Sequence, residues 1–295
     1  MTRPHTIWME GPSVSSSRAC LPVSDRGVLY GEGLFETILV RAGRAFCLRA
    51  HLGRMAASAQ ALGLPLPEPG WEKRVCRALG KMAADLGDRW GRARLTLTAG
   101  DGEPGGDPAA PPTGPARLFL RVSPVSLPAS GVWGRAVTAV VSGPRRAGTA
   151  EDLACHKTLS YLGNLLCLRQ ARRLGADEGL VQGAAGQVVS GARANLFVVQ
   201  DGRLRTPDKG CLPGITRALV RHEIAPTLSI PLEKTSLGEA DLWTAQEVFL
   251  TNSLVGILPV GRIGRRPRDG RRVGPITSRI IRCYRDILAQ AGRWE

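Results

Sequence analysis

One lysine has the surroundings that carbonyl chemistry needs. Lys157 lies in the run His-Lys-Thr-Leu-Ser-Tyr at positions 156–161, at the start of a predicted helix. A lysine amine attacks a carbonyl only in its neutral form, and partial burial lowers its pKa toward that form. Tyr161 follows at a spacing of four, which on a helix would place both side chains on one face. Position alone favours a solvated surface lysine, and a core aromatic is the alternative explanation of Tyr161, so a catalytic interpretation of Lys157 depends on the rest of the pattern.

Three further places carry groups suited to binding a phosphate. Gly214, Ile215 and Thr216 open a predicted helix, where backbone N–H groups and a hydroxyl gather. Ser253 follows a predicted strand, and Arg54 lies on a predicted amphipathic helix. Each also has an ordinary explanation, because threonine caps helices and arginine occupies exposed helix faces. Only their joint occurrence favours an anion site.

Apolar periodicity and turn residues predict the elements that must position these groups. Strands are expected at 29–40, 45–48, 92–98, 117–122, 136–141, 179–182, 196–200, 204–206 and 247–251. Helices are expected at 52–62, 71–86, 160–174 and from 214 onward. The turn at 41–44 predicts a hairpin between the first two strands, and Asp201-Gly202 predicts another between 196–200 and 204–206. The Gly- and Pro-rich segment 101–115 is expected to be a loop.

This arrangement predicts an α+β fold of two domains. The segment 123–131 carries two prolines and is the expected linker. It would join a smaller N-terminal α/β domain, residues 1–122, to a larger strand-rich C-terminal domain, residues 132–295, which would carry Lys157.

Composition restricts the class of protein. The chain has 295 residues, of which 43% are hydrophobic and 22% charged, as in globular proteins with a core. No apolar run approaches the ~20 residues of a membrane helix, and no signal-peptide pattern follows the first residues, so a cytoplasmic location is expected. Seven scattered cysteines suggest neither disulfides nor a metal site. The net charge of +15 is spread along the chain, which favours anionic small molecules over nucleic acid as partners.

The order and spacing of the motifs resemble those of the fold-type IV pyridoxal-phosphate (PLP) enzymes. The motifs are Asp-Arg-Gly at 25–27, Gly-Glu-Gly-Leu-Phe-Glu-Thr at 31–37, the lysine run at 156–161, Asn-Leu-Phe at 195–197, Leu-Pro-Gly-Ile-Thr-Arg at 212–217 and Thr-Asn-Ser at 251–253. The resemblance implies a two-domain fold of the D-amino acid aminotransferase type, PLP as the cofactor and a homodimer. It runs from about residue 8 to residue 262.

The resemblance also implies roles for single residues. Lys157 would hold the cofactor covalently and later move the substrate proton. Tyr161 would donate a hydrogen bond to the phenolic oxygen of the cofactor. The cofactor phosphate would be bound by Arg54, Ile215, Thr216 and Ser253.

Two positions depart from the family pattern. Ser190 stands where the family normally carries a glutamate against the pyridine nitrogen. A carboxylate keeps that nitrogen protonated and makes the ring a strong electron sink, which a hydroxyl does less well. Ala99 stands where many lyases carry an arginine that could meet a substrate carboxylate. Its substitutes would be Arg26, Arg94 or Arg193.

The motifs at 212–217 and 251–254 are more similar to those of aminodeoxychorismate lyases than to those of branched-chain aminotransferases. The favoured hypothesis is therefore a lyase that converts 4-amino-4-deoxychorismate to 4-aminobenzoate and pyruvate, a step toward folate. The loss of the carboxylate at position 190 agrees with it, because aromatisation of the product drives such an elimination. One alternative is an aminotransferase for a branched-chain or D-amino acid. The other is a basic binding protein on a degenerate enzyme scaffold.

Overall fold

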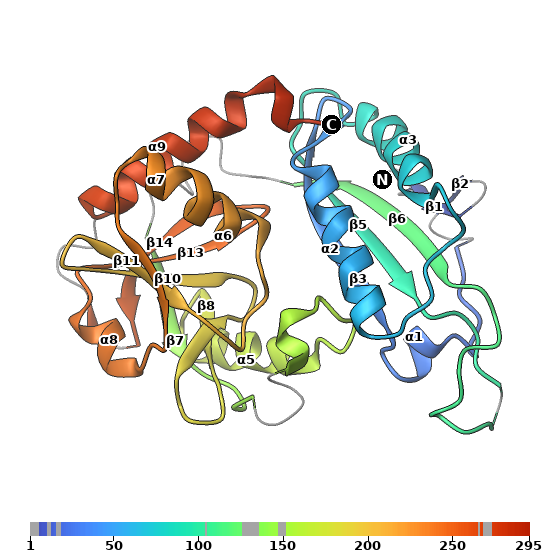
Figure 1. Ribbon diagram of the computed structural model, residues 1–295, viewed down its shortest axis with the longest axis horizontal. Coiled ribbons are helices and arrows are strands. Elements are labelled where there is room, and N and C mark those ends of the chain that lie inside the picture. Colours follow the sequence, from blue (N-terminus) through green and yellow to red (C-terminus); the bar gives the residue numbers. More distant parts are fainter. Residues whose placement is uncertain are drawn as a thin grey trace. The chain divides into compact units, whose positions relative to one another are not determined.

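The chain folds into two units in the computed structural model (Figure 1), which describes residues 6–10, 13–15, 19–103, 105–125, 136–146, 152–264, 266–267 and 273–295. The first unit comprises Met1–Ser126, Lys157–Ser160 and Ala291–Glu295. The second unit comprises Leu127–His156 and Tyr161–Gln290. The first unit ends inside the expected linker, of which residues 126–131 lie outside the described part. The units differ from the predicted domains in that Lys157 and the last residues of the chain belong to the first unit.

The first unit is built on a six-stranded antiparallel sheet with the order β2-β1-β6-β5-β3-β4. Its strands are β1 (Thr6–Met9), β2 (Ser13–Ser15), β3 (Gly33–Arg41), β4 (Arg44–Ala45), β5 (Gly91–Thr98) and β6 (Arg117–Pro124). Its helices are α1 (Arg26–Leu29), α2 (Leu48–Ala61), α3 (Trp71–Ala84) and the 3₁₀ turn η3 (Ala291–Arg293). The expected β3–β4 hairpin is therefore confirmed.

Alternation along β3 gives its two faces different surroundings. Leu34, Ile38 and Val40 point into the core that the sheet forms with the apolar residues of α2 and α3. Glu36 lies on this same face, among apolar neighbours. Phe35 points to the opposite face, so the strand presents a carboxylate on one side and an aromatic ring on the other.

A segment from the middle of the chain extends the sheet beside the start of β3. The backbone N–H of Phe35 donates to the carbonyl oxygen of Lys157, and that of Leu159 donates to the carbonyl oxygen of Gly33, both at 2.9 Å. Gly33 permits this approach, because a Cβ atom there would lie 2.7 Å from Cδ1 of Leu159. Lys157 is therefore held in extended backbone against a strand.

The second unit is built on a mixed sheet with the order β12-β11-β10-β13-β14-β7-β8-β9, and β15 pairs with β14. The strands are β7 (Val137–Val141), β8 (Glu178–Gln182), β9 (Val188–Gly191), β10 (Asn195–Gln200), β11 (Arg203–Pro207), β12 (Leu232–Thr235), β13 (Glu247–Asn252), β14 (Gly256–Ile263) and β15 (Arg266–Pro267). The pairs β7–β8, β7–β14 and β11–β12 are parallel. The predicted turn at 201–202 joins β10 to β11.

Helices border this sheet along its length. They are η1 (Leu153–Cys155), α5 (Leu162–Arg173), α6 (Ile215–Leu219), η2 (Val220–Ile224), α7 (Ala225–Thr227), α8 (Glu239–Thr244) and α9 (Pro275–Ala289). The elements α6, η2 and α7 follow one another without a break, and η2 is a π-helical turn. No helix in the described part of the chain is long and apolar enough to cross a membrane.

The sequence predicted most of these elements, with shifts of a few residues at their ends. One prediction was wrong at its start: the strand expected at 29–40 begins only at Gly33, because Leu29 is the last residue of the short helix α1. Asp25 caps this short helix by accepting a hydrogen bond from the N–H of Gly27 at 2.8 Å. Elements that the sequence did not predict are β1, β2, β9, β12, β14, β15, α1, α8, α9, η1 and η3.

Candidate active site

The first unit places Lys157 in surroundings that favour a neutral amine. Its side chain is half-buried, and its Nζ atom lies 4.3 Å from the centre of the Phe35 ring. Burial lowers the pKa of Lys157 to about 8; Glu36 opposes this shift, and the nearby guanidinium groups of Arg54 and Arg94 add to it. An amine with this pKa is partly neutral at physiological pH and can act as a nucleophile and a base.

Arg94 contacts the same aromatic ring as Lys157. It projects from β5 with an exposed side chain, and its guanidinium carbon lies 3.8 Å from the centre of the same Phe35 ring. Arg26 is buried, forms an ion pair with Glu32 and donates to a backbone carbonyl. Arg193, in the second unit, forms an ion pair with Glu178. Of the three arginines considered from the sequence, Arg94 is thus the one placed beside the reactive lysine.

A buried ion cluster lies on the helix-covered face of β3. Arg54 donates to Glu36 through Nε at 2.8 Å and through Nη2 at 2.6 Å, and Nδ1 of His51 lies 2.7 Å from the same carboxylate. Glu36 and His51 are each 1% exposed. His51 and Arg54 are three residues apart on α2, so they share a helix face. The cluster therefore fixes Arg54, the predicted phosphate ligand, in one orientation.

The charges in this cluster follow from its contacts. Burial alone would raise the pKa of Glu36, but the hydrogen bonds from His51 and Arg54 outweigh it and lower that pKa to about 2. Burial lowers the pKa of His51 against the opposing effect of Glu36. A neutral His51 must carry its proton on Nδ1 to donate to the carboxylate. Glu36 is thus an anion that neutralises Arg54.

Tyr161 does not share a helix face with Lys157. Residues 157–160 pair with β3 through an isolated bridge, and α5 begins only at Leu162, with Tyr161 at its N-terminal boundary. The helical relation expected from their spacing is therefore wrong, because the pairing with β3 keeps the lysine out of the helix. Lys157 belongs to the first unit and Tyr161 to the second.

A polar network in the second unit connects Tyr161 to the region of Ser190. The hydroxyl of Tyr161 donates to the carbonyl oxygen of Ala192 at 2.9 Å, and Nδ2 of Asn164 donates to the same oxygen at 2.7 Å. Oδ1 of Asn164 accepts a hydrogen bond from Nη2 of Arg146 at 3.0 Å. Nη1 of Arg146 lies 3.5 Å from the hydroxyl of Ser190, which is buried on β9. Burial raises the pKa of Tyr161, so its hydroxyl stays protonated.

The predicted phosphate site at Ile215 and Thr216 is the start of a helix that no side chain caps within the described residues. The first N–H groups of a helix lack acceptors inside it, so they can bind an anion. Gly214 is required here, because a Cβ atom would lie 2.0 Å from Oδ1 of Asn195. Asn195 in turn donates to the carbonyl oxygen of Leu212 at 2.7 Å and fixes the approach to the helix.

Ser253 opens the turn that follows β13. The side chain of Asn252 shapes this turn by accepting hydrogen bonds from the N–H groups of Leu254 at 3.0 Å and Val255 at 2.9 Å. Helix α6 packs beside β13. On that strand the hydroxyl of Thr251 is buried without a hydrogen-bond partner in the described structure. Unused polar groups therefore gather at this end of the second unit.

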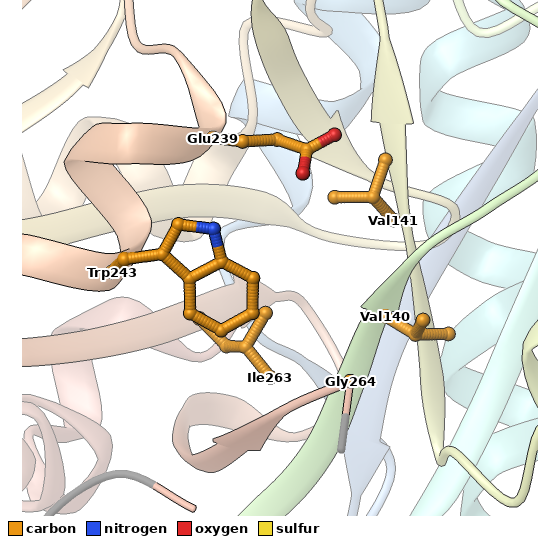
Figure 2. Close-up of a pocket in the computed structure, with 6 residues that line it drawn as sticks. All are labelled: Val140, Val141, Glu239, Trp243, Ile263 and Gly264. Carbon is orange, nitrogen blue, oxygen red and sulfur yellow. The ribbon is translucent and has the colours of Figure 1, made fainter. Parts of the chain in front are cut away.

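One pocket of about 200 Å³ lies elsewhere in the second unit (Figure 2). It is lined by Val140, Val141, Glu239, Trp243, Ile263 and Gly264. In Figure 2 the carboxylate of Glu239 points toward the side of the pocket where Val141 lies. None of the predicted site residues lines it, so we assign the chemistry to the groups described above.

Sequence reasoning missed four residues that hold the predicted ones in place. Glu36 and His51 orient Arg54, whereas Arg146 and Asn164 connect Ser190 to Tyr161. A signal existed for the first pair, since Glu36 lies in the quoted run at 31–37 and His51 precedes Arg54 by one helical turn. Nothing in the sequence marks Arg146, because it sits among many other arginines.

A family pattern, two related sequences and a solved structure all relate this chain to class IV aminotransferases and aminodeoxychorismate lyases. The sequence pattern described as "Amino-transferase class IV" matches residues 33–263. A Methanocaldococcus jannaschii protein, provisionally named a branched-chain-amino-acid aminotransferase, is 33% identical over 97% of each chain. A Mycobacterium tuberculosis protein named bifunctional aminodeoxychorismate lyase / D-amino acid transaminase is 30% identical over 90% of this chain and 92% of its own. The crystal structure of 4-amino-4-deoxychorismate lyase from Pseudomonas aeruginosa superposes with a TM-score of 0.81 and 34% identity, covering 96% of this chain and 100% of that one.

Proposed function

The chain belongs to the class IV aminotransferase family of PLP-dependent enzymes, and from this premise we propose that it converts 4-amino-4-deoxychorismate to 4-aminobenzoate and pyruvate. Its cofactor is pyridoxal 5'-phosphate, as in the family. The family membership is shown, whereas the lyase reaction is our proposal. It is supported by the properties of Lys157, Ser190 and Arg94.

The residues present fit PLP. Lys157, half-buried and with a pKa near 8, has the properties of an amine that binds an aldehyde. The uncapped helix start at Ile215 and Thr216 and the buried, unpartnered hydroxyl of Thr251 suit the phosphate. Arg54, which Glu36 holds in one orientation in the first unit, is kept as a predicted phosphate ligand. We keep Ser253 and Tyr161 as predicted cofactor contacts.

The observation that carries the lyase assignment is Ser190. A buried hydroxyl next to a guanidinium stands where the family normally has a carboxylate. Transamination needs a carbanion that survives until a proton is added to the cofactor, so it needs a strong electron sink. Elimination to an aromatic product needs only a weaker electron sink, because aromatisation of the product drives the step. The weakened sink therefore favours the lyase reaction over amino transfer.

Bound PLP supplies an electron-withdrawing ring conjugated to the substrate amine. Lys157 Nζ is then available to take the proton from C4 of the substrate ring. The bond between C3 and the enolpyruvyl oxygen breaks, the ring becomes aromatic, and pyruvate gains one proton on its methylene carbon. Lys157 can return the proton it took, so protons balance over the cycle. Its pKa near 8 suits it to both transfers at neutral pH.

Arg94 is the residue that we propose for a substrate carboxylate. Replacing Arg94 with glutamine should raise KM for aminodeoxychorismate by about 10-fold or more with a smaller change in kcat, because a charge-assisted hydrogen bond is lost. The same change should raise the pKa of Lys157, since Arg94 helps to lower it. The pH dependence of covalent PLP uptake should then shift to higher pH.

Steady-state kinetics and the pH dependence of cofactor absorbance measure these two effects. Arg92→Gln, on the same strand and also exposed, is the matched control and should change neither. An unchanged KM in Arg94→Gln would remove Arg94 from the substrate site.

The decisive test of the proposed function is formation of 4-aminobenzoate from freshly prepared aminodeoxychorismate by the PLP-loaded protein. Product is expected, together with an equal amount of pyruvate. No product from protein that carries PLP covalently would contradict the lyase assignment.

A second candidate function is amino transfer to a keto acid from a branched-chain or D-amino acid. The names of the relatives favour it, including the Mycobacterium tuberculosis protein whose name combines both activities. Keto-acid-dependent amino transfer, with conversion of PLP to the pyridoxamine form, would identify it. A binding protein without catalysis is set aside, because the family consists of PLP-dependent enzymes.

We also propose that the chain forms a homodimer. Helix α5 exposes Leu162, Leu165 and Leu166, at 62%, 39% and 43% of their surfaces. Apolar side chains gathered on one short helix are typical of a surface that another protein covers. Sedimentation equilibrium should give about twice the chain mass, and a Leu162→Glu/Leu166→Glu variant should sediment as a monomer. A wild-type monomer would contradict the proposal.

A further inference from the structure

The contact between Arg146 and Ser190 is the feature of the second unit that the proposed reaction does not by itself require. Nη1 of Arg146 lies 3.5 Å from the hydroxyl oxygen of Ser190, at the long limit of a hydrogen bond. Ser190 is 4% exposed, and Arg146 is half-buried. A positive charge therefore lies next to a buried hydroxyl in a region where water screens charges poorly.

Arg146 is held at this place by further hydrogen bonds. Nη1 also donates to the carbonyl oxygen of Gly210 at 3.0 Å, and Nη2 donates to Oδ1 of Asn164 at 3.0 Å. Asn164 is itself fixed, because its Nδ2 donates to the carbonyl oxygen of Ala192. These anchors come from a strand end, a loop and helix α5, so the guanidinium has little freedom to move away from Ser190.

The position of the guanidinium decides what Ser190 can offer to a ligand. A serine hydroxyl has one proton to donate and two lone pairs to accept with. Because Arg146 can only donate, it approaches the oxygen through a lone pair. The hydroxyl proton is then left to point elsewhere, toward an acceptor. A neutral pyridine nitrogen is such an acceptor, whereas a protonated pyridinium is a donor and a cation.

We propose that Ser190 and Arg146 together hold the ring nitrogen of bound PLP unprotonated, with the serine hydroxyl donating to it. The inference rests on the proposed function in one respect, namely that PLP binds with its ring nitrogen at Ser190. It adds an electrostatic reason why the chain would be a poor transaminase: a nearby fixed cation disfavours a second positive charge on the ring.

The other charged groups near Ser190 do not cancel the effect of Arg146 on the protonation of the ring nitrogen. Glu178, on β8, is the nearby carboxylate, and burial raises its pKa. Its charge is offset by Arg193, whose side chain approaches it to 2.9 Å and whose backbone N–H donates to it at 3.2 Å. Tyr161 keeps its proton and donates to a carbonyl oxygen. Arg146 is thus the charged group that contacts Ser190 directly.

The experiment is ¹⁵N NMR of the whole chain loaded with PLP that is labelled at the ring nitrogen. The wild-type resonance should lie at the free-base position at pH 7. Ser190→Glu should move it to the pyridinium position. Arg146→Gln should raise the pH of half-protonation by about one unit, since a like charge is removed. Arg146→Lys keeps the positive charge, so its ring-nitrogen resonance should match that of the wild type. Arg145→Gln, a change at the exposed neighbouring residue, should also leave the resonance unchanged.

The outcomes separate this inference from the proposed function. A pyridinium resonance in wild-type protein would overturn the inference even if 4-aminobenzoate is formed. A free-base resonance in protein that makes no 4-aminobenzoate would support the inference and contradict the lyase assignment. Unchanged resonances in both Ser190→Glu and Arg146→Gln would show that neither residue acts on the ring nitrogen, and would also overturn it. Failure to bind PLP covalently would overturn both.

Discussion

Replacing Lys157 with alanine should reduce 4-aminobenzoate formation at least about 10³-fold, because one side chain carries both the covalent bond to PLP and the proton transfer. General acid–base catalysis alone contributes about 10²–10⁴-fold, and loss of the covalent anchor adds to it. The variant should also lack the visible absorbance of lysine-bound cofactor. Rapid product assays and absorption spectra of the PLP-treated variant measure both effects.

Lys81→Ala is the matched control, since Lys81 is exposed on α3, far along the chain from the site residues. It should keep full activity and normal absorbance. Retained turnover in Lys157→Ala would remove this lysine from the mechanism, whichever reaction the enzyme catalyses.

Replacing Glu36 with glutamine should destabilise the first unit by about 3–5 kcal/mol, the typical effect of removing one partner of a buried ion pair. The change leaves the guanidinium of Arg54 buried without its carboxylate. Because the pKa of Glu36 is about 2 in the folded chain against a usual 4.5, its ion pair contributes fully above pH about 5 and is lost as the pH falls toward 2. The difference in stability between wild type and variant should therefore shrink in acid.

Urea unfolding of the wild type and the variant between pH 3 and pH 7 measures this effect. Glu72→Gln, an exposed glutamate on α3, should change stability by less than about 0.5 kcal/mol. In the double variant Glu36→Gln/Arg54→Met part of the loss should be recovered, because no charge is left unpaired. Equal stability of wild type and Glu36→Gln at pH 7 would show that the cluster does not stabilise the fold.

The sequence predicted the site residues through motifs, but not the contacts that give them their properties. Ile215 and Thr216 could be assigned to a helix start because Gly and Thr mark such positions. The lowered pKa of Lys157 could not be derived in the same way. It arises first from burial and then from the guanidinium groups of Arg54 and Arg94, which lie far from Lys157 in the sequence.

The errors in secondary structure have local physical causes. The spacing of Lys157 and Tyr161 fits a helix, yet hydrogen bonds to β3 keep residues 157–160 extended. Strand β9 has only four residues, all buried, so it shows no alternation of apolar and polar side chains. Helix α9 was missed although its buried residues Ile280, Ile281, Tyr284, Ile287 and Leu288 recur with helical spacing. Tertiary contacts explain the first case, whereas in the last the sequence itself carries the helical period.

The pairing of residues 157–160 with β3 has a consequence for the order in which the chain matures. Strand β3 leaves the ribosome long before these residues do, and the intervening chain includes strands of both units. Contacts between segments that lie so far apart in the sequence form slowly, because the long loop between them must first be closed. Until they form, the amine of Lys157 is an ordinary, fully protonated lysine at neutral pH. The amine of Lys157 therefore becomes reactive toward aldehydes only once this pairing and the burial that accompanies it have formed.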